Sequence, residues 1–195
     1  MPKTVLASAA SNSASSINRK LVEHAARTFK ADFMPDVVIE TLDLNDYEMP
    51  IYSQAREQES GIPAKAQAFY DKIGEADGLM IAFAEHNGSY AAAYKNIFDW
   101  MSRIKMAVYQ NKPTAFFATS PGPRGGQKVL EFAVMTAPFF GAKVVGSQSI
   151  AGFGERFDDA TGGMTHDDDV EAMNAALRAM GEAMSADVEP LSAAA

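Results

Sequence analysis

The chain has 195 residues, a length that suits one domain, with 47% hydrophobic and 22% charged residues, so its composition is globular rather than disordered. A formal net charge of -8 disfavours nucleic acid and anionic membranes as partners. Without cysteine the chain can form no disulfide, iron–sulfur cluster or thiol nucleophile, so any redox chemistry needs a bound cofactor.

Strand-like and helix-like segments alternate along the first half of the chain. The pattern predicts a strand over residues 4–9, a second near 37–42 and a third over 78–83. The third run is apolar almost throughout, which is typical of a strand buried on both faces, so we place it at the centre of a sheet. Helices are predicted between these strands, over 63–74 and in a segment with apolar residues at Ile17, Leu21, Val22, Ala25, Ala26 and Phe29.

The second half continues the alternation with a helix over residues 92–108 whose apolar surface is wider than one stripe. Its apolar residues are Tyr94, Ile97, Phe98, Trp100, Met101 and Ile104. This width fits either deep burial within the domain or a subunit interface. Strands and helices follow at 114–119, 127–140, 143–150 and 167–184.

Five such alternations predict an α/β fold in which a doubly wound, five-stranded parallel sheet of order 2-1-3-4-5 lies between two helical layers. We expect one domain over residues 1–185 and a flexible tail over 186–195. In this fold ligands bind beyond the carboxyl ends of the strands, where the order reverses. The loops after the first, third and fourth strands should therefore line one cleft.

The loop after the first strand, residues 8–19, reads SAASNSASSINR and leads into a helix amino terminus. Its hydroxyls and free backbone N–H groups could surround a phosphate dianion, which the helix dipole would stabilise. It lacks both the ending of a P-loop and the G-x-G-x-x-G pattern, which argues against ATP hydrolysis and a dinucleotide fingerprint. The alternative is a turn in which Ser15 or Ser16 only caps the helix.

The other two loops carry turn residues of their own. Residues 84–90 read AEHNGSY, and the Asn-Gly pair permits a tight turn whose backbone groups could meet a flat ring. Residues 119–126 read TSPGPRGG, where paired glycines allow a ligand to approach the backbone and Arg124 could meet an anionic nucleotide. Each loop could equally be an ordinary connection, with Arg124 a solvated surface residue.

Two of these loops carry motifs that resemble the NAD(P)H-dependent FMN reductases, a family of flavodoxin-like fold that includes quinone, chromate and azo-dye reductases. The family's Gly-Ser-x-Arg-x-x-Ser-x-Asn is matched at Ser11, Ser16 and Asn18. Its Pro-Glu-Tyr-Asn-Gly-Ser and downstream Lys-Asn-x-x-Asp-Trp are matched by AEHNGS at 84–89 and KNIFDW at 95–100.

The resemblance extends to two further stretches and has three departures. The family's Ser-Pro-Gly with a following Gly-Gly is similar to residues 120–126, and its Leu-Pro-x-aromatic loop to MPIY at 49–52. The family's arginine, tyrosine and proline are replaced by Ser13, His86 and Ala84. Loss of the arginine removes a charge-assisted bond worth about 1.5–3 kcal/mol.

What the resemblance implies is an FMN-containing oxidoreductase that transfers hydride from NADPH or NADH to flavin, quinone or similar small acceptors, acting as a homodimer or homotetramer. No side-chain nucleophile is required. The residues that would hold FMN are Ser11, Ser13, Ser16, Ile17, Asn18, Glu85, His86, Asn87, Gly88, Ser120, Gly122 and Gly125. His86 could also give a proton to a reduced quinone, or could simply pack beside the ring.

Other classes remain to be weighed against this one. A flavin-binding or scaffold protein of the same fold that lacks reductase activity is the main alternative, and Ser13, His86 and Ala84 favour it. The segment HDDD at 166–169 could offer metal ligands, but we expect it to be a helix start capped by Thr165, and we expect no metal site. Because no apolar run approaches roughly 18 residues, we expect a cytoplasmic protein without a membrane partner.

Overall fold

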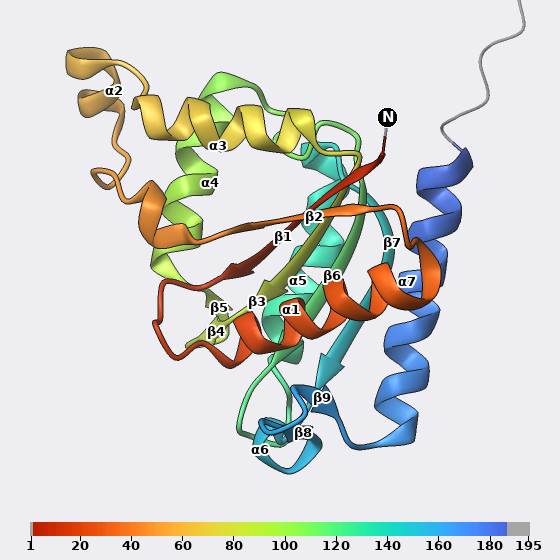
Figure 1. The fold of residues 1–195 in the computed structure, drawn as a ribbon. Coiled ribbons are helices and arrows are strands. Elements are labelled where there is room, and N and C mark those ends of the chain that lie inside the picture. Colours follow the sequence, from red (N-terminus) through yellow and green to blue (C-terminus); the bar gives the residue numbers. More distant parts are fainter. Residues whose placement is uncertain (1, 187–195) are drawn as a thin grey trace, which may run out of the picture.

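Five parallel strands form a central sheet in the order β2-β1-β3-β6-β7 (Figure 1). The computed structural model describes residues 2–186. The strands of the sheet are β1 Thr4–Ala10, β2 Val38–Leu42, β3 Gly78–Phe83, β6 Pro113–Thr119 and β7 Lys143–Ile150. Since β6 and β7 are the fourth and fifth strands of this sheet, the predicted order 2-1-3-4-5 and the doubly wound α/β fold are confirmed.

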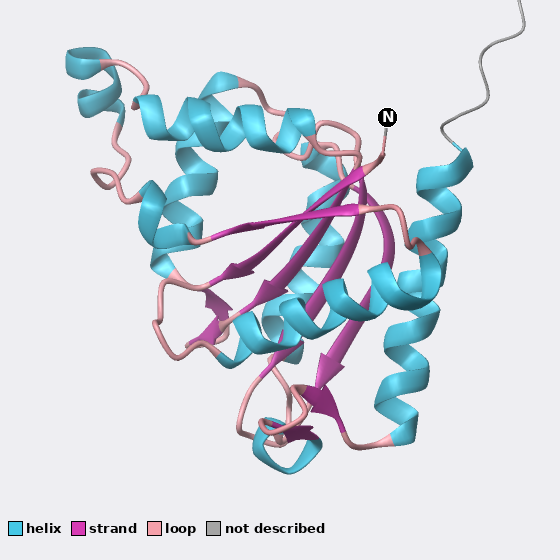
Figure 2. Ribbon diagram, in the orientation of Figure 1, coloured by secondary structure: helices cyan, strands magenta, loops and turns pink. Residues whose placement is uncertain are grey.

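Helices cover both faces of the sheet and complete three layers (Figure 2). One face carries α1 Ile17–Thr28 and α7 Asp167–Ala186, which pack in a common apolar cluster with β1 and β3. The other carries α3 Ala64–Glu75, α4 Ala92–Ile104 and α5 Gln127–Thr136. None of the helices in residues 2–186 is long and apolar enough to cross a membrane.

The central strand β3 contributes buried side chains to the packing on both faces of the sheet. All six of its residues are buried. Leu79, Ile81 and Phe83 join the cluster under α3, α4 and α5, while Met80 and Ala82 join the cluster under α1 and α7. This alternation is the period of two that a strand imposes on its side chains, and it confirms the predicted central position.

The wide apolar surface of α4 is buried within the domain. Tyr94, Ile97, Phe98, Trp100 and Met101 are each at most 9% exposed, so none of the five needs a partner subunit to cover it. The helix ends at Ile104, four residues before the predicted end, because the backbone at position 105 turns to an extended conformation with φ -156°.

The predicted helix over 127–140 is divided. The α-helix α5 ends at Thr136, and a 3-10 turn covers Ala137–Phe140. Pro138 lies at the start of this turn and cannot donate the hydrogen bond that would continue the α-helix.

Several short elements are absent from the sequence prediction. They are the π-helical turn Phe29–Phe33, the 3-10 turn Leu44–Tyr47, α2 Gln54–Ser60, α6 Phe153–Arg156 and two hairpins, β4 Glu85–His86 with β5 Ser89–Tyr90 and β8 Phe157–Asp158 with β9 Gly163–Met164. Ala186, where the flexible tail was expected to begin, is the last residue of α7. The rest of that tail, residues 187–195, lies outside the described residues.

Candidate functional site

Three loops meet at the carboxyl ends of β1, β3 and β6, as the strand order requires (Figure 1). Hydrogen bonds tie them to one another and to the neighbouring elements. The start of α1 is bonded to the end of β6 through Asn18 and Thr119, and the loop after β3 is bonded to the start of α5 through Glu85 and Val129. The predicted grouping of the three loops at one edge of the sheet is therefore observed.

The loop after β1 places hydrogen-bond donors at this edge, where Ser11 and Ser16 are themselves buried. Ser16 is the N-cap of α1 and accepts a hydrogen bond from the Arg19 N–H at 3.3 Å, while the Ser11 hydroxyl accepts one from the Ser13 N–H at 3.2 Å. Each hydroxyl acts as an acceptor here, so each keeps its own O–H free to donate. The first N–H groups of α1, at Ile17 and Asn18, have no acceptor within the helix.

These donors suit an anion. The first turn of α1 holds no acidic residue, and its amino terminus carries the positive end of the helix dipole. The capping function that we considered as an alternative for Ser16 is also present, and the two roles are compatible. The side chain of Ser13 is exposed, so its position can supply a hydroxyl but no positive charge.

The side chain of Asn18 links the start of α1 to the end of β6. Its side chain is only 3% exposed, and both ends of the amide are bonded to Thr119. The amide Nδ2 donates to the Thr119 carbonyl at 3.1 Å, and Oδ1 accepts from the Thr119 N–H at 2.9 Å. Because β3 ends at Phe83, opposite Ala118, this amide takes the place of the next peptide group beside β6. One N–H of the side-chain amide and its oxygen are therefore engaged, which leaves the second Nδ2 N–H and the backbone N–H of Asn18 without a partner among these bonds.

The loop after β3 folds into the short hairpin of β4 and β5. Asn87 and Gly88 form its turn with φ values of 53° and 77°, which is the pattern of a two-residue hairpin turn and one that glycine and asparagine tolerate best. His86 lies on this hairpin with an exposed side chain. The turn therefore projects from the edge of the sheet with its backbone accessible.

Glu85 fixes the base of the hairpin. Its carboxylate Oε2 accepts a hydrogen bond from the Val129 N–H at 3.2 Å, in the first turn of α5. The N-cap residue of α5 is Gly126, which has no side chain to cap the helix. Glu85 provides that cap from another loop, and its charge also suits the positive end of the α5 dipole.

The glycines after β6 differ in how closely the protein packs around them. A Cβ atom at Gly125, where φ is +58°, would lie 2.6 Å from the Ile150 carbonyl carbon at the end of β7. At Gly122 the nearest atom to such a Cβ would be the Ser120 Oγ at 3.9 Å. Gly122 thus faces more open space, while the space beside the Cα of Gly125 is filled by β7.

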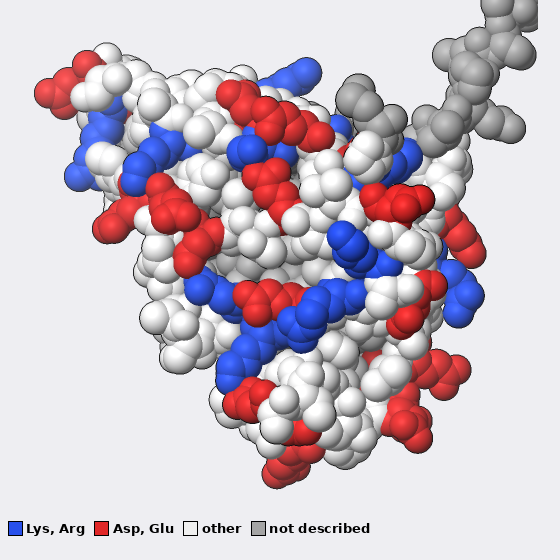
Figure 3. Space-filling model, in the orientation of Figure 1, with Lys and Arg blue, Asp and Glu red and all other residues white. Residues whose placement is uncertain are grey.

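Basic side chains gather over α1 on the face shown in Figure 3, interleaved with acidic ones. Arg19 is paired with Asp43 at 2.6 Å and Lys20 with Asp159 at 2.7 Å, so neither is free to bind an anion. On α5, the Lys128 side chain passes close to the hairpin turn, since a Cβ atom at Gly88 would lie 3.6 Å from its Cδ. The exposed Arg124 lies in the loop after β6, and Lys128 lies in the first turn of α5 that follows this loop.

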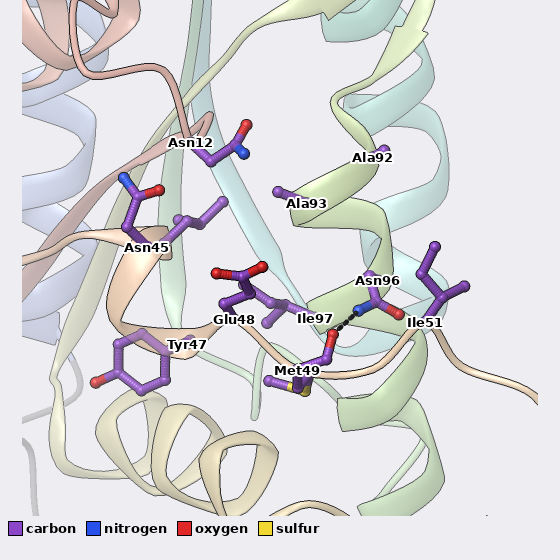
Figure 4. A pocket seen from close by; sticks show the side chains of 11 residues that line it. Asn12, Asn45, Tyr47, Glu48, Met49, Ile51, Ala92, Ala93, Asn96 and Ile97 are labelled. Atoms are coloured by element: carbon purple, nitrogen blue, oxygen red, sulfur yellow. Dashed lines mark hydrogen bonds between the residues drawn. The ribbon is translucent and has the colours of Figure 1, made fainter. Parts of the chain in front are cut away.

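A pocket of about 250 Å³ opens beside the loop after β1 (Figure 4). It is lined by Asn12, Leu44, Asn45, Tyr47, Glu48, Met49, Ile51, Ala92, Ala93, Asn96 and Ile97. Of these residues, periodicity singled out Ile97, and the family resemblance drew attention to Asn96 and to residues 49–52.

The Lys-Asn-x-x-Asp-Trp motif holds the wall of this pocket in place. The Asn96 amide donates to the carbonyls of Met49 and Pro50 at 3.1 and 3.2 Å and accepts from the Tyr52 N–H at 2.8 Å. Trp100 donates its ring N–H to the Pro50 carbonyl at 2.7 Å. The motif is thus a structural support for residues 49–52.

The acidic segment at 166–169 belongs to the start of α7. Asp169 is paired with Arg156 at 2.6 Å, and within residues 2–186 no group of three or more metal-ligating side chains is present. Thr165 is not the cap we expected, because the helix begins at Asp167 and the N–H groups of Asp169 and Val170 are bonded to the carbonyl of the preceding residue, His166.

Comparison with known proteins gives consistent relatives. Residues 4–156 match the model of the family described as NADPH-dependent FMN reductase. A quinone reductase of Escherichia coli K12 is 28% identical over 137 residues, which cover 69% of this chain and 73% of the relative. A 2-hydroxy-1,4-benzoquinone reductase of a Burkholderia species is 37% identical over 111 residues, 56% of each chain.

The fold has a close counterpart among solved structures. The flavoenzyme NAD(P)H:(acceptor) oxidoreductase of Paracoccus denitrificans superposes with a TM-score of 0.72 at 21% sequence identity. The superposition covers 94% of this chain and 98% of that protein. At this level of identity the likeness concerns the flavodoxin-like fold.

Proposed function

The chain belongs to the NADPH-dependent FMN reductase family, and from this premise we propose that the three loops at the carboxyl edge of the sheet hold FMN for the reduction of quinones or similar small acceptors. The protein is an NAD(P)H-dependent flavin oxidoreductase. The observation that supports the site is the set of unused donors at the start of α1, on the loop that carries the family's phosphate motif.

The residues present fit the cofactor. The phosphate would accept hydrogen bonds from the hydroxyls of Ser11 and Ser16 and from the backbone N–H groups of Ile17 and Asn18, with the hydroxyl of Ser13 at the exposed side. Because Ser13 replaces an arginine of the family, the helix dipole would supply most of the positive potential. We expect weaker FMN binding than an arginine would give, by about 1.5–3 kcal/mol.

The hairpin and the loop after β6 would hold the ring from two sides. The turn at Asn87 and Gly88 would offer backbone groups to the polar edge of the ring. Glu85 would hold this turn in place through its hydrogen bond to α5. Ser120 and Gly122 border the open space on the other side. Gly125 contributes by letting this loop pack against β7.

The chemistry that FMN supplies when bound is the acceptance of a hydride from NAD(P)H and the delivery of two electrons to the acceptor. The protein's own part is to orient the two substrates and to manage protons. A quinone takes up two protons with its two electrons, and the exposed His86 imidazole on the hairpin can deliver one of them. Arg124 and Lys128 would attract the phosphates of the nucleotide.

A second copy of the chain is the proposed partner. On α5 and the turn that follows it, Phe132, Met135 and Phe139 are 42%, 63% and 81% exposed at a spacing that places them along one side. Single exposed apolar residues are ordinary, but a row of large ones is typical of an interface. The Phe132 ring contacts Tyr90 of the hairpin at 5.4 Å, so a dimer made through this row would lie beside the site.

We propose that residues 1–185 act as one domain, because both helical layers pack on the same sheet. We also place the enzyme in the cytoplasm, where its nucleotide donor is available. Light scattering of the wild-type protein and of Met135→Glu would test the interface, since a buried glutamate should dissociate the dimer.

The function is tested by the visible absorption spectrum of the purified protein, recorded with and without added FMN and then with NADPH or NADH under anaerobic conditions. Flavin bands that appear with the protein and bleach on addition of nucleotide would support both cofactor and reaction. Binding of FMN without bleaching would indicate a flavin carrier, and absence of binding would indicate a scaffold that has kept only the fold.

A further inference from the structure

The pocket beside the loop after β1 contains one formal charge. Among its lining residues within 2–186, Glu48 carries the only charge, while Asn12, Asn45 and Asn96 supply neutral amides and Leu44, Ala93 and Ile97 supply apolar surface. Figure 4 shows the Glu48 carboxylate directed into the space between Asn45 and the helix α4. The pocket therefore combines an apolar floor with a negative rim.

The backbone around Glu48 is fixed from both sides. On one side the 3-10 turn Leu44–Tyr47 begins at Asp43, whose side chain accepts from the Asn45 N–H at 2.9 Å. On the other side Asn96 holds the carbonyls of Met49 and Pro50. The position of the Glu48 backbone at this pocket is thus a property of the fold rather than of a free loop.

The surrounding cations do not neutralise Glu48. Arg19 is paired with Asp43 at 2.6 Å, and Lys95 on α4 is paired with Asp99 at 2.6 Å. No ion pair of Glu48 is found within residues 2–186. Asp46, two residues before Glu48, adds to the negative charge of the same segment. An anion entering the pocket would therefore meet a repulsive potential.

The pocket adjoins both segments that we assign to FMN. Asn12 belongs to the loop proposed to bind the phosphate, and Ala92 and Ala93 begin α4 directly after the hairpin proposed to frame the ring. A small flat molecule in the pocket would lie at the border of the flavin. Its apolar floor and its amide groups suit the carbon ring and the carbonyl oxygens of a quinone.

We propose that this pocket receives the electron acceptor and that Glu48 determines specificity, by favouring uncharged acceptors over anionic ones. The inference rests on the proposed function, because it presupposes a reductase that passes electrons to a small acceptor. In water, a like charge about 4 Å away lowers the binding constant of a charged ligand by a factor of about five. Added salt screens this repulsion.

The test compares 1,4-naphthoquinone with 1,4-naphthoquinone-2-sulfonate as acceptors for the FMN-loaded enzyme. The measured quantity is kcat/KM for the sulfonate divided by kcat/KM for the parent quinone, which is then compared between wild type and Glu48→Gln. The comparison between proteins cancels the difference in reduction potential between the two quinones. Glu59→Gln is the matched control, because Glu59 is an exposed glutamate of α2 outside the pocket and its loss changes the net charge equally.

We expect the ratio to rise about fivefold in Glu48→Gln and to remain at the wild-type value in Glu59→Gln. In the wild-type enzyme the ratio should also rise between 20 mM and 500 mM NaCl. A ratio that is unchanged in Glu48→Gln, or that rises equally in both variants, would overturn the assignment while leaving the reductase function intact. Failure of the wild-type enzyme to reduce either quinone would instead contradict the proposed function itself.

Discussion

Replacing Asn18 by alanine separates a structural role of this residue from a role in binding phosphate. The amide makes two hydrogen bonds to the main chain of Thr119, at 3.1 and 2.9 Å, and Thr119 is 1% exposed. In Asn18→Ala both main-chain groups lose their partner in a place that water reaches poorly. Each buried group left unsatisfied costs about 1–3 kcal/mol, so the free energy of unfolding should fall by about 2–5 kcal/mol.

This loss is large compared with the stability of a typical domain, which is about 5–15 kcal/mol. Urea unfolding of the apoprotein, followed by circular dichroism at 25 °C, measures it directly. Asn12→Ala is the control, since Asn12 is an exposed asparagine of the same loop and its replacement should change the unfolding free energy by no more than about 0.5 kcal/mol.

The same variant is then titrated with FMN under conditions in which it is folded. If the amide only holds β6, the dissociation constant for FMN should change little, because the backbone N–H of residue 18 is retained. An apoprotein of wild-type stability that has lost most of its affinity for FMN would refute this reasoning. That result would show that the amide contacts the phosphate and that its bonds to Thr119 are dispensable.

Three further predictions concern Glu85, Gly125 and His24. Glu85→Ala removes the cap of α5 and should lower the unfolding free energy by about 1 kcal/mol, whereas Glu85→Gln keeps an acceptor and should recover most of it in urea unfolding. Gly125→Ala should lower the unfolding free energy by about 2–4 kcal/mol, because it combines a positive φ with a Cβ 2.6 Å from β7. Gly122→Ala should lower it by less than about 1 kcal/mol. Equal losses of unfolding free energy in the two variants would contradict the packing role of Gly125. Burial lowers the pKa of His24 from its ordinary value of about 6.5, so the unfolded chain takes up a proton first as pH falls. The free energy of unfolding should therefore decline as the pH falls from 7.5 to 5.5, and urea unfolding at each pH should show a smaller decline in His24→Gln.

The sheet could be predicted because its signals are local. The apolar run of β3 and the helical spacing on α1 and α4 reflect burial that each segment carries in its own sequence. The connections could not be predicted in this way. Residues 44–52 take their path from Asn96 and Trp100, which lie 44 to 50 positions further along the chain.

The candidate site shows the same division. The hydroxyl of Ser16 at the start of a helix is a local signal, and its capping role was open to prediction from the sequence. The partner of Asn18 could not be predicted, because Thr119 is 101 positions away and a motif does not state what each of its residues touches. The packing of Gly125 against β7 could not be predicted, because a glycine in a loop indicates that space is short but not which atoms fill it.

The bond between Asn18 and Thr119 also bears on the order in which the chain folds. The bond at the start of α1 can form only when the end of β6 lies beside it, and in the sheet β6 is held between β3 and β7. Contacts of such long range form late and make folding slow. A ligand held at the start of α1 would then find its complete site only in the nearly finished protein. FMN should accordingly slow unfolding while leaving the rate of refolding almost unchanged.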